Sequence, residues 1–202
     1  MREVYRAIVL VLSSVRLMPH VLVLLRSSHR DLIWADLIRW SEIYHLGYSK
    51  SIARRVYLFL KLMTFYREFR NVFYFRIGMF GRLIRIFCRP LATLQLDSKR
   101  IGPGLFIQHG YDTWVSAEEI GENCWINQQV TIGYTNETDR PTLGNNVTIN
   151  VGAKILGKVK LGDDSKVGAN SVVIMDVPPG VTVMGVPATA LWIRKTTPQC
   201  LS

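Results

Sequence analysis

The sequence predicts a helical, basic segment followed by a solenoid of short β-strands. Three observations lead to this fold class. An aliphatic residue recurs every six positions through much of the second half, the positive charge is concentrated in the first half, and arginines there alternate with large apolar residues at helix-like intervals. A chain of 202 residues is long enough for one domain with a buried core and a helical extension.

The six-residue repeat is the most informative pattern in the chain. Its units begin at Ile101, Ile107, Ile120, Ile126, Ile132, Leu143, Ile149, Ile155, Leu161, Val167 and Val173, and a polar insertion runs from Tyr134 to Thr142. A period of six fits neither a helix of 3.6 residues per turn nor strict strand alternation. It is typical of a solenoid in which each unit forms one strand and a turn, and three units complete a coil. The aliphatic residue stacks inside, and the glycine that often follows it permits the turn.

The charge is divided unequally between the two halves. Residues 1–100 carry 18 basic and 6 acidic side chains, whereas residues 101–202 carry 7 and 9. Arg76, Arg82, Arg85 and Arg89 recur among large apolar groups, which is typical of an amphipathic helix at an anionic membrane surface. A helical subdomain that packs its apolar face on a neighbour explains the pattern equally well, whereas nucleic acid is a disfavoured partner.

The apolar run from Ala7 to Leu25 is the candidate for a membrane span. Arg16, Pro19 and His20 lie near its middle, and an arginine at the bilayer centre costs roughly 2.5–3.5 kcal/mol. The run also lacks the small-residue cleavage site of a signal peptide. We therefore expect a cytoplasmic protein that does not cross the membrane and that lies on its inner face if the arginines of the helical half contact lipid.

Cysteine spacing and missing motifs exclude several classes of site. Cys88, Cys124 and Cys200 are widely spaced and odd in number, which excludes a disulfide framework and a CxxC-type zinc or redox site. The sequence has no cluster of histidines, cysteines and carboxylates to hold a metal and no phosphate-binding loop. We therefore expect neither a metal nor a nucleotide cofactor.

Three parts of the repeat region carry longer patterns. They are Ile101-Gly-Pro-Gly-Leu-Phe-Ile-Gln-His, the pair Val151-Gly-Ala-Lys-Ile-Leu-Gly and Val167-Gly-Ala-Asn-Ser-Val-Val, and the exit Val177-Pro-Pro-Gly followed by Gly185-Val-Pro-Ala. These patterns resemble the hexapeptide-repeat acyltransferases, and within them the serine-acetyltransferase-like branch. The resemblance implies a left-handed parallel β-helix over residues 99–188. A helical, basic domain over residues 1–98 precedes it, and a C-terminal tail over residues 189–202 follows it.

One histidine in the repeat region is the candidate for chemistry. Acyl transfer from a thioester to a hydroxyl needs a base that takes the hydroxyl proton, and imidazole suits this role. His20, His29 and His45 lie in the helical half, whereas His109 occupies the third position of its unit, which points outward in a solenoid. The resemblance implies that His109 is the general base and that the acceptor attacks acetyl-CoA directly, without an acyl-enzyme.

Two positions depart from the family pattern. Serine acetyltransferases carry an aspartate in the coil before the histidine, and Leu94 stands at the matching position here. The nearby Asp97 or a backbone carbonyl is therefore left to orient the second ring nitrogen of His109. The acceptor-binding loop keeps Asp139 and Arg140 but lacks its histidine. Arg140 could still hold an anionic group of the acceptor through its planar fork.

The resemblance also implies how coenzyme A is bound. In this family the pantetheine arm lies between the coils of neighbouring subunits, so we expect a cyclic homotrimer. The residues that align with the lining of the coenzyme A groove in the family are Gly133, Val151, Gly168 and Ala169. The cations near enough in sequence to compensate the phosphate charge are Lys166, Arg194 and Lys195.

Three functions follow from these observations. We expect an acetyl-CoA-dependent O-acetyltransferase that modifies a sugar hydroxyl of a surface polysaccharide or its precursor, because both departures weaken a site for free serine. The alternative enzyme is a serine O-acetyltransferase of cysteine biosynthesis. The non-enzymatic alternative is a membrane-bound β-helix scaffold, which has no need of an outward histidine at position 109.

Overall fold

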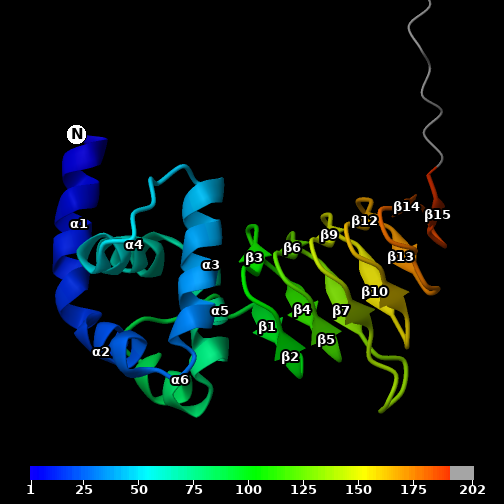
Figure 1. Cartoon of the computed structure of the whole chain (residues 1–202), viewed down its shortest axis with the longest axis horizontal. Coiled ribbons are helices and arrows are strands. Elements are labelled where there is room, and N and C mark those ends of the chain that lie inside the picture. Colours follow the sequence, from blue (N-terminus) through cyan, green and yellow to red (C-terminus); the bar gives the residue numbers. More distant parts are fainter. Residues whose placement is uncertain (192–202) are drawn as a thin grey trace, which may run out of the picture.

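The first half of the chain is helical and the second half is a β-helix that extends from one side of it (Figure 1). The computed structural model describes residues 1–191. Within them the helices are α1 (Arg2–Arg16), α2 (Met18–Arg26), α3 (Arg30–Ile43), α4 (Ile52–Phe65), α5 (Arg67–Ile77) and α6 (Met79–Ile84). Helices α3 and α5 contact the β-helix, whereas α1 lies on the far side of the helical domain. The predicted order of a helical domain and a β-helix is thus confirmed.

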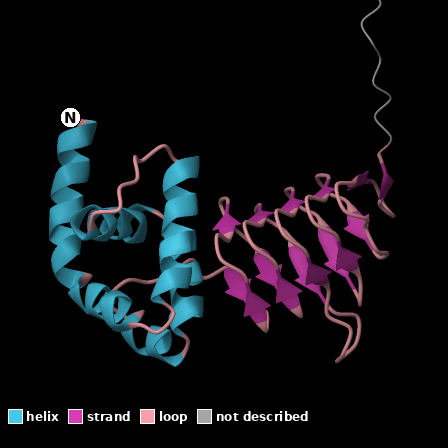
Figure 2. Cartoon of the chain, in the orientation of Figure 1, coloured by secondary structure: helices cyan, strands magenta, loops and turns pink. Residues whose placement is uncertain are grey.

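Short strands wind into three sheets that form the faces of the β-helix (Figure 2). The strands of the described residues are β1 (Leu94–Leu96), β2 (Arg100–Ile101), β3 (Phe106–Ile107), β4 (Thr113–Val115), β5 (Glu119–Ile120), β6 (Trp125–Ile126), β7 (Thr131–Gly133), β8 (Thr142–Leu143), β9 (Thr148–Ile149), β10 (Lys154–Leu156), β11 (Lys160–Leu161), β12 (Lys166–Val167), β13 (Val172–Val173), β14 (Thr182–Met184) and β15 (Thr189–Ala190). The sheet orders are β1-β4-β7-β10-β13, β11-β8-β5-β2 and β15-β14-β12-β9-β6-β3. From β1 to β10 each strand pairs in parallel with the third strand after it, so three strands make one coil. The first strand begins at Leu94, ahead of residue 99.

The aliphatic residues of the repeat stack into three columns inside the coils. The columns contain Ile101, Ile120, Leu143 and Leu161; Ile107, Ile126, Ile149 and Val167; and Val115, Ile132, Ile155 and Val173. All are buried, and full burial of such a side chain stabilises a fold by about 1.5–3 kcal/mol. Val115 lay outside the predicted series of repeat units, because extra residues before it interrupt the period of six.

The glycines that follow the aliphatic column are required by close packing rather than by a turn. Neither Gly102 nor Gly121 has a positive φ, yet a Cβ on Gly102 would lie 2.7 Å from the carbonyl carbon of Gly121 in the next coil. Left-handed backbone occurs instead at corner residues such as Asn123, Asn146 and Asp164, whose short polar side chains tolerate it. The expectation that the repeat glycine forms the turn was therefore wrong at these positions.

A buried ion pair joins the helical domain to the first coil. Asp36 on α3 accepts hydrogen bonds from Nε and Nη2 of Arg76 on α5, at 2.8 and 3.0 Å, and both side chains are 2% exposed. Arg76 also donates to the backbone carbonyls of Ile101 and Gly102, and Asp36 accepts from two backbone N–H groups of the same coil. The prediction that groups Arg76 with the membrane-facing arginines was therefore wrong, because its partners lie inside the molecule.

Aromatic packing and a side-chain amide complete this junction. The indole of Trp40 donates to the carbonyl of Leu105 at 2.9 Å, and its ring packs edge-on against Phe106 with 4.7 Å between centroids. The amide of Asn71 on α5 donates to the carbonyl of Leu94 at 2.9 Å. The orientation of α5 relative to the first coil is therefore determined by bonds at several points along the helix.

We expect Asp36→Asn to lower the free energy of unfolding by about 3–5 kcal/mol, because the variant leaves the Arg76 cation buried without its counter-charge. Chemical denaturation followed by circular dichroism measures the change. Glu119→Gln is the matched control, since Glu119 forms an exposed 2.8 Å pair with Arg100 and such pairs contribute about 0–1 kcal/mol. Equal effects of the two variants would contradict the role given to Asp36.

A second buried polar group lies within the helical domain. Nε2 of His20 is 2.8 Å from the hydroxyl oxygen of Tyr74, whose own proton is donated to the carbonyl of Cys88. His20 is fully buried, and desolvation, with the nearby charges of Arg16 and Arg70, lowers its pKa from 6.5 to about 4. The folded protein therefore holds His20 neutral at a pH where the unfolded chain would protonate it.

This difference predicts acid sensitivity. Between about pH 6.5 and 4 the unfolded chain binds a proton at His20 that the folded protein does not, so stability falls as the pH falls through this window. We expect a loss of about 2–3 kcal/mol that His20→Gln removes, because glutamine keeps a donor for Tyr74 but does not titrate. Thermal unfolding measured across this pH range tests it, with the exposed His29→Gln as control. An unchanged pH dependence in His20→Gln would contradict the assignment.

Candidate active site

His109 lies at an enlarged corner of the first coil. Val115 lies eight positions after Ile107 in the chain. In the next coil Ile132, the partner of Val115, lies only six positions after Ile126, the partner of Ile107. The two extra residues form a bulge in which His109 and Gly110 both have positive φ, +64° and +57°. The imidazole is exposed, as its outward repeat position predicts, and is free to meet a substrate.

Two of the predicted coenzyme-binding residues lie on the same edge of the β-helix as His109. The column Ile107, Ile126, Ile149 and Val167 is in register from coil to coil. His109, Val151 and Ala169 each lie two residues beyond a member of that column, at the corner that ends this face. The edge thus carries small or short side chains beyond the histidine, as an extended ligand arm requires.

The other predicted coenzyme-binding residues are more scattered. Gly133 is buried at the end of β7 on the adjoining face, and its carbonyl accepts from the backbone N–H of Gly157. Gly168 follows β12, where a Cβ would lie 2.8 Å from the Cβ of Met184, and Lys166 on β12 is exposed. Arg194 and Lys195 lie outside the described residues.

The polar insertion is a loop stabilised by its own side chains. Asp139 accepts hydrogen bonds from the backbone N–H groups of Thr135 and Asn136 at 2.8 and 2.9 Å, and hydrogen bonding, chiefly from the Thr135 hydroxyl, lowers the pKa of Asp139. Arg140 donates to the carbonyl of Asp97 at 2.9 Å, and Nη2 of Arg140 is 3.6 Å from a carboxylate oxygen of Asp97. The structure therefore brings together two of the predicted residues, Arg140 and Asp97.

A carboxylate that no repeat pattern indicates lies against Gly110, the residue that follows His109. A Cβ on Gly110 would lie 2.9 Å from Cγ of Glu68 and 3.2 Å from Cδ2 of Leu94, so both side chains cover the residue that follows His109. Glu68 belongs to the first turn of α5, about forty residues earlier in the chain. No repeat or motif could reveal this proximity, because it depends on how the helical domain docks.

Known proteins share both the repeat and the overall arrangement. Residues 140–174 match the family described as bacterial transferase hexapeptide (six repeats). A serine acetyltransferase of Synechococcus elongatus is 37% identical over 122 residues, which cover 58% of this chain and 50% of that protein. The chain spans about half the length of the curated relatives it matches.

Solved structures extend the likeness to the helical domain. Soybean serine acetyltransferase complexed with serine is 29% identical, with a TM-score of 0.60 over 81% of this chain and 70% of that chain. A serine acetyltransferase from Brucella abortus in complex with coenzyme A has the same fold, with 24% identity and a TM-score of 0.60 over 85% of this chain and 71% of that chain. The repeat region of the chain is therefore that of a hexapeptide-repeat transferase. In sequence and in fold the chain resembles the serine acetyltransferases.

These relatives correct the expectation of a sugar acceptor. The main prediction from the sequence, an O-acetyltransferase of a surface polysaccharide, was wrong, because the similar proteins are serine acetyltransferases and the soybean structure holds serine. The prediction of a sugar acceptor depended on Leu94 and on the missing loop histidine. The absence of two contacts does not exclude serine, since other elements can supply equivalent contacts, and Glu68 shows that a carboxylate reaches this corner from the helical domain.

Proposed function

We propose that this protein is an acetyl-CoA-dependent serine O-acetyltransferase. The observation that supports it best is the exposed His109 at the bulged corner of the first coil, in a chain that resembles the serine acetyltransferases. A solenoid that served only as a scaffold would have no use for an outward imidazole at an enlarged corner. The widely spaced thiols, of which Cys88 and Cys124 are buried and free, suit a cytoplasmic enzyme.

The reaction requires one base and one leaving group. The hydroxyl proton of serine passes to the free ring nitrogen of His109 as the serine oxygen attacks the thioester carbonyl carbon of acetyl-CoA. The carbon–sulfur bond of the resulting tetrahedral intermediate then breaks. O-acetylserine forms, and the departing thiolate of coenzyme A takes the proton from His109, which returns the base to its starting state.

The two substrates are proposed to be held by different residues. The edge with Val151 and Ala169 offers a track of short side chains for the pantetheine arm, and Lys166 is an exposed cation for a phosphate. Arg140 is the candidate for the carboxylate of serine, with Asp139 holding its loop in place. We propose a homotrimer, in which the arm lies against a neighbouring copy.

We expect His109→Ala to lower kcat for serine acetylation by about 10²–10⁴-fold, because the variant loses the base that takes the hydroxyl proton. Release of the coenzyme A thiol, measured with and without serine, follows the reaction. The exposed His29→Ala is the matched control, and sedimentation should find both variants as trimers. An unaffected rate in His109→Ala, or acetylation of a sugar hydroxyl with no turnover of serine, would contradict the proposal.

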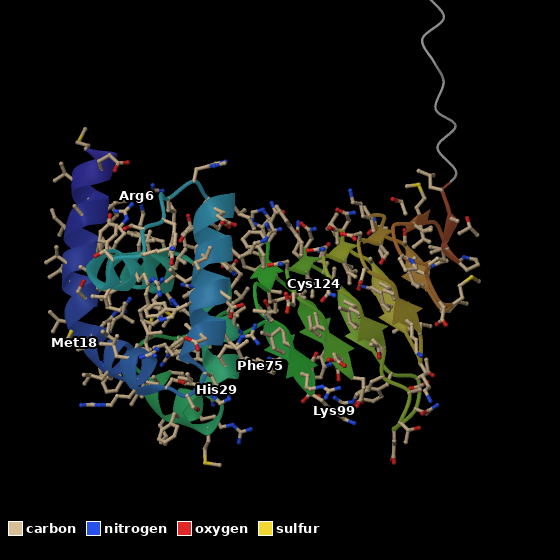
Figure 3. The ribbon with its side chains drawn as sticks, in the orientation of Figure 1. Arg6, Met18, His29, Phe75, Lys99 and Cys124 are labelled. Carbon is tan, nitrogen blue, oxygen red and sulfur yellow. The ribbon has the colours of Figure 1, made fainter. Side chains whose placement is uncertain are left out.

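We also propose that the helical domain contacts an anionic membrane surface. Exposed apolar side chains gather on α1 and around α6: Val4, Tyr5, Ile8, Val11, Leu12, Val15, Met79, Phe80, Leu83, Ile86 and Phe87. An apolar hollow of about 680 Å³ lies between α2 and α6, with Arg26 at its lining, and Arg82 and Arg85 are exposed on or beside α6. Met18, at the junction of α1 and α2, points away from the β-helix (Figure 3). Apolar groups flanked by arginines are typical of interfacial binding.

No single described helix is long and apolar enough to cross a membrane. One pair, Glu3–Arg16 with Met18–Arg26, has the length and composition of a span but is bent by 65°.

We expect vesicles that contain anionic lipid to capture the protein at low salt and to release it at high salt, because each cation near the surface contributes about 1 kcal/mol that salt screens. Flotation measures capture. Phe80→Ser should weaken it, whereas Ile52→Ser, an exposed aliphatic residue on α4, should not. Equal capture by neutral and anionic vesicles, or none by either, would remove the electrostatic role of the arginines.

A further inference from the structure

We propose that Glu68 is the positioning residue for His109, an inference that rests on the proposed acetyltransferase function. A base that uses one ring nitrogen to take a proton is held in the correct tautomer and orientation by an acceptor for its other N–H group. The coil itself offers Leu94 where its relatives carry an aspartate, and the two substitutes suggested by the sequence were Asp97 and a backbone carbonyl. The structure favours a carboxylate from the helical domain.

The position of Glu68 is the first observation. If Gly110 carried a Cβ, that atom would lie 2.9 Å from Cγ of Glu68 and 3.2 Å from Cδ2 of Leu94. The carboxylate of Glu68 is therefore carried to the same corner of the coil that the side chain at position 94 reaches. A glutamate on α5 and a leucine on β1 thus occupy adjoining space against Gly110, the residue that follows the histidine.

The second observation is that Glu68 has no counter-ion among the described residues. Arg70, two positions along α5, gives its guanidinium to three backbone carbonyls, those of Met63, Thr64 and Arg89, at 2.6–2.7 Å. Glu68 is half-buried and forms no ion pair within the part of the chain that the structure describes. Burying a carboxylate is costly when no lysine or arginine pairs with it. Such a carboxylate is suited to accept a hydrogen bond from a neighbouring imidazole N–H group.

The electrostatics of the corner agree with this placement. Burial raises the pKa of the Glu68 carboxyl, while its own backbone N–H and the charges of His109, Arg70 and Arg67 act in the opposite direction. Tyr44 and Tyr66 face the same carboxylate, and burial raises the pKa of Tyr44 to about 12. The pKa of Tyr66 is raised as well, so both phenols stay neutral at the pH of catalysis. Glu68 therefore supplies the negative charge on this side of the corner, against the positive charges of Arg67 and Arg70.

Asp97, the other candidate, is directed elsewhere. Its carboxylate lies 3.6 Å from Nη2 of Arg140 and 3.3 Å from the hydroxyl of Ser116. Glu68 and His109 are not within hydrogen-bond distance in the described structure. Catalytic hydrogen bonds are often longer without substrate and tighten in the reacting complex.

The test compares Glu68→Gln with the wild type in the full-length protein. We expect kcat for serine acetylation to fall by about 10–100-fold with little change in the KM for acetyl-CoA. The acidic limb of the kcat/KM profile should move to lower pH, because loss of the facing negative charge makes the imidazole easier to deprotonate. Glu68→Asp should restore part of the rate. The matched control is Asp31→Asn, an exposed acid in the first turn of α3, which should change neither rate nor profile.

Two further measurements separate positioning from a structural role. In a His109→Ala background, Glu68→Gln should cause no further loss of rate, since the two residues act as one unit. A nuclear magnetic resonance titration of the His109 ring should move to lower pH in Glu68→Gln than in the wild type. An unchanged titration and pH–rate profile, or equal losses with and without His109, would overturn the inference.

The titration also distinguishes the two proposals. If the wild type fails to acetylate serine but Glu68→Gln still moves the His109 titration, the proposed function fails and the coupling of Glu68 to His109 stands. If the wild type acetylates serine and Glu68→Gln changes neither the rate nor the titration, the function stands and the positioning role fails.

Discussion

The ion pair between Asp36 and Arg76 is the interaction on which the geometry of the candidate site depends. Burying a carboxylate and a guanidinium is costly unless each is fully hydrogen-bonded. Here the remaining hydrogen-bonding groups are satisfied by the backbone of the first coil, at Ile101, Gly102, Gly104 and Leu105. The pair is therefore stable only when the helices and the coil are docked. Docking is consequently specific in position, which an apolar contact alone would not ensure.

This specificity explains how two distant segments can build one corner of the candidate site. Arg76 lies near the end of α5, Asn71 in its middle bonds to the carbonyl of Leu94, and Glu68 lies in its first turn. Because a helix is stiff over this length, bonds at its end and middle also position its start. The helical domain is thus more than an attachment to the β-helix. In the proposed mechanism it supplies the carboxylate that the first coil lacks.

The coil geometry places a complementary constraint on the site. Stacked coils repeat at the spacing of paired strands, and the aliphatic columns and the close-packed glycines leave little room for variation inside. Variation is tolerated at the corners, where extra residues project outward without disturbing the columns. The bulge that carries His109 and the loop that carries Arg140 are both insertions of this kind. The candidate chemistry is therefore confined to the places where the repeat is broken.

The sequence by itself determined the β-helix, the helical nature of the first half and the outward position of His109. These features depend on local periodicity, and a period of six with an aliphatic residue in each unit permits few other structures. It did not determine the role of Arg76, whose spacing matched a surface arginine although its partner, Asp36, lies forty residues away. Nor could it reveal Glu68, or show that Asp97 is held by Arg140. Those contacts join residues far apart in the chain, and only the docking of α5 on the first coil and the path of the inserted loop bring them together.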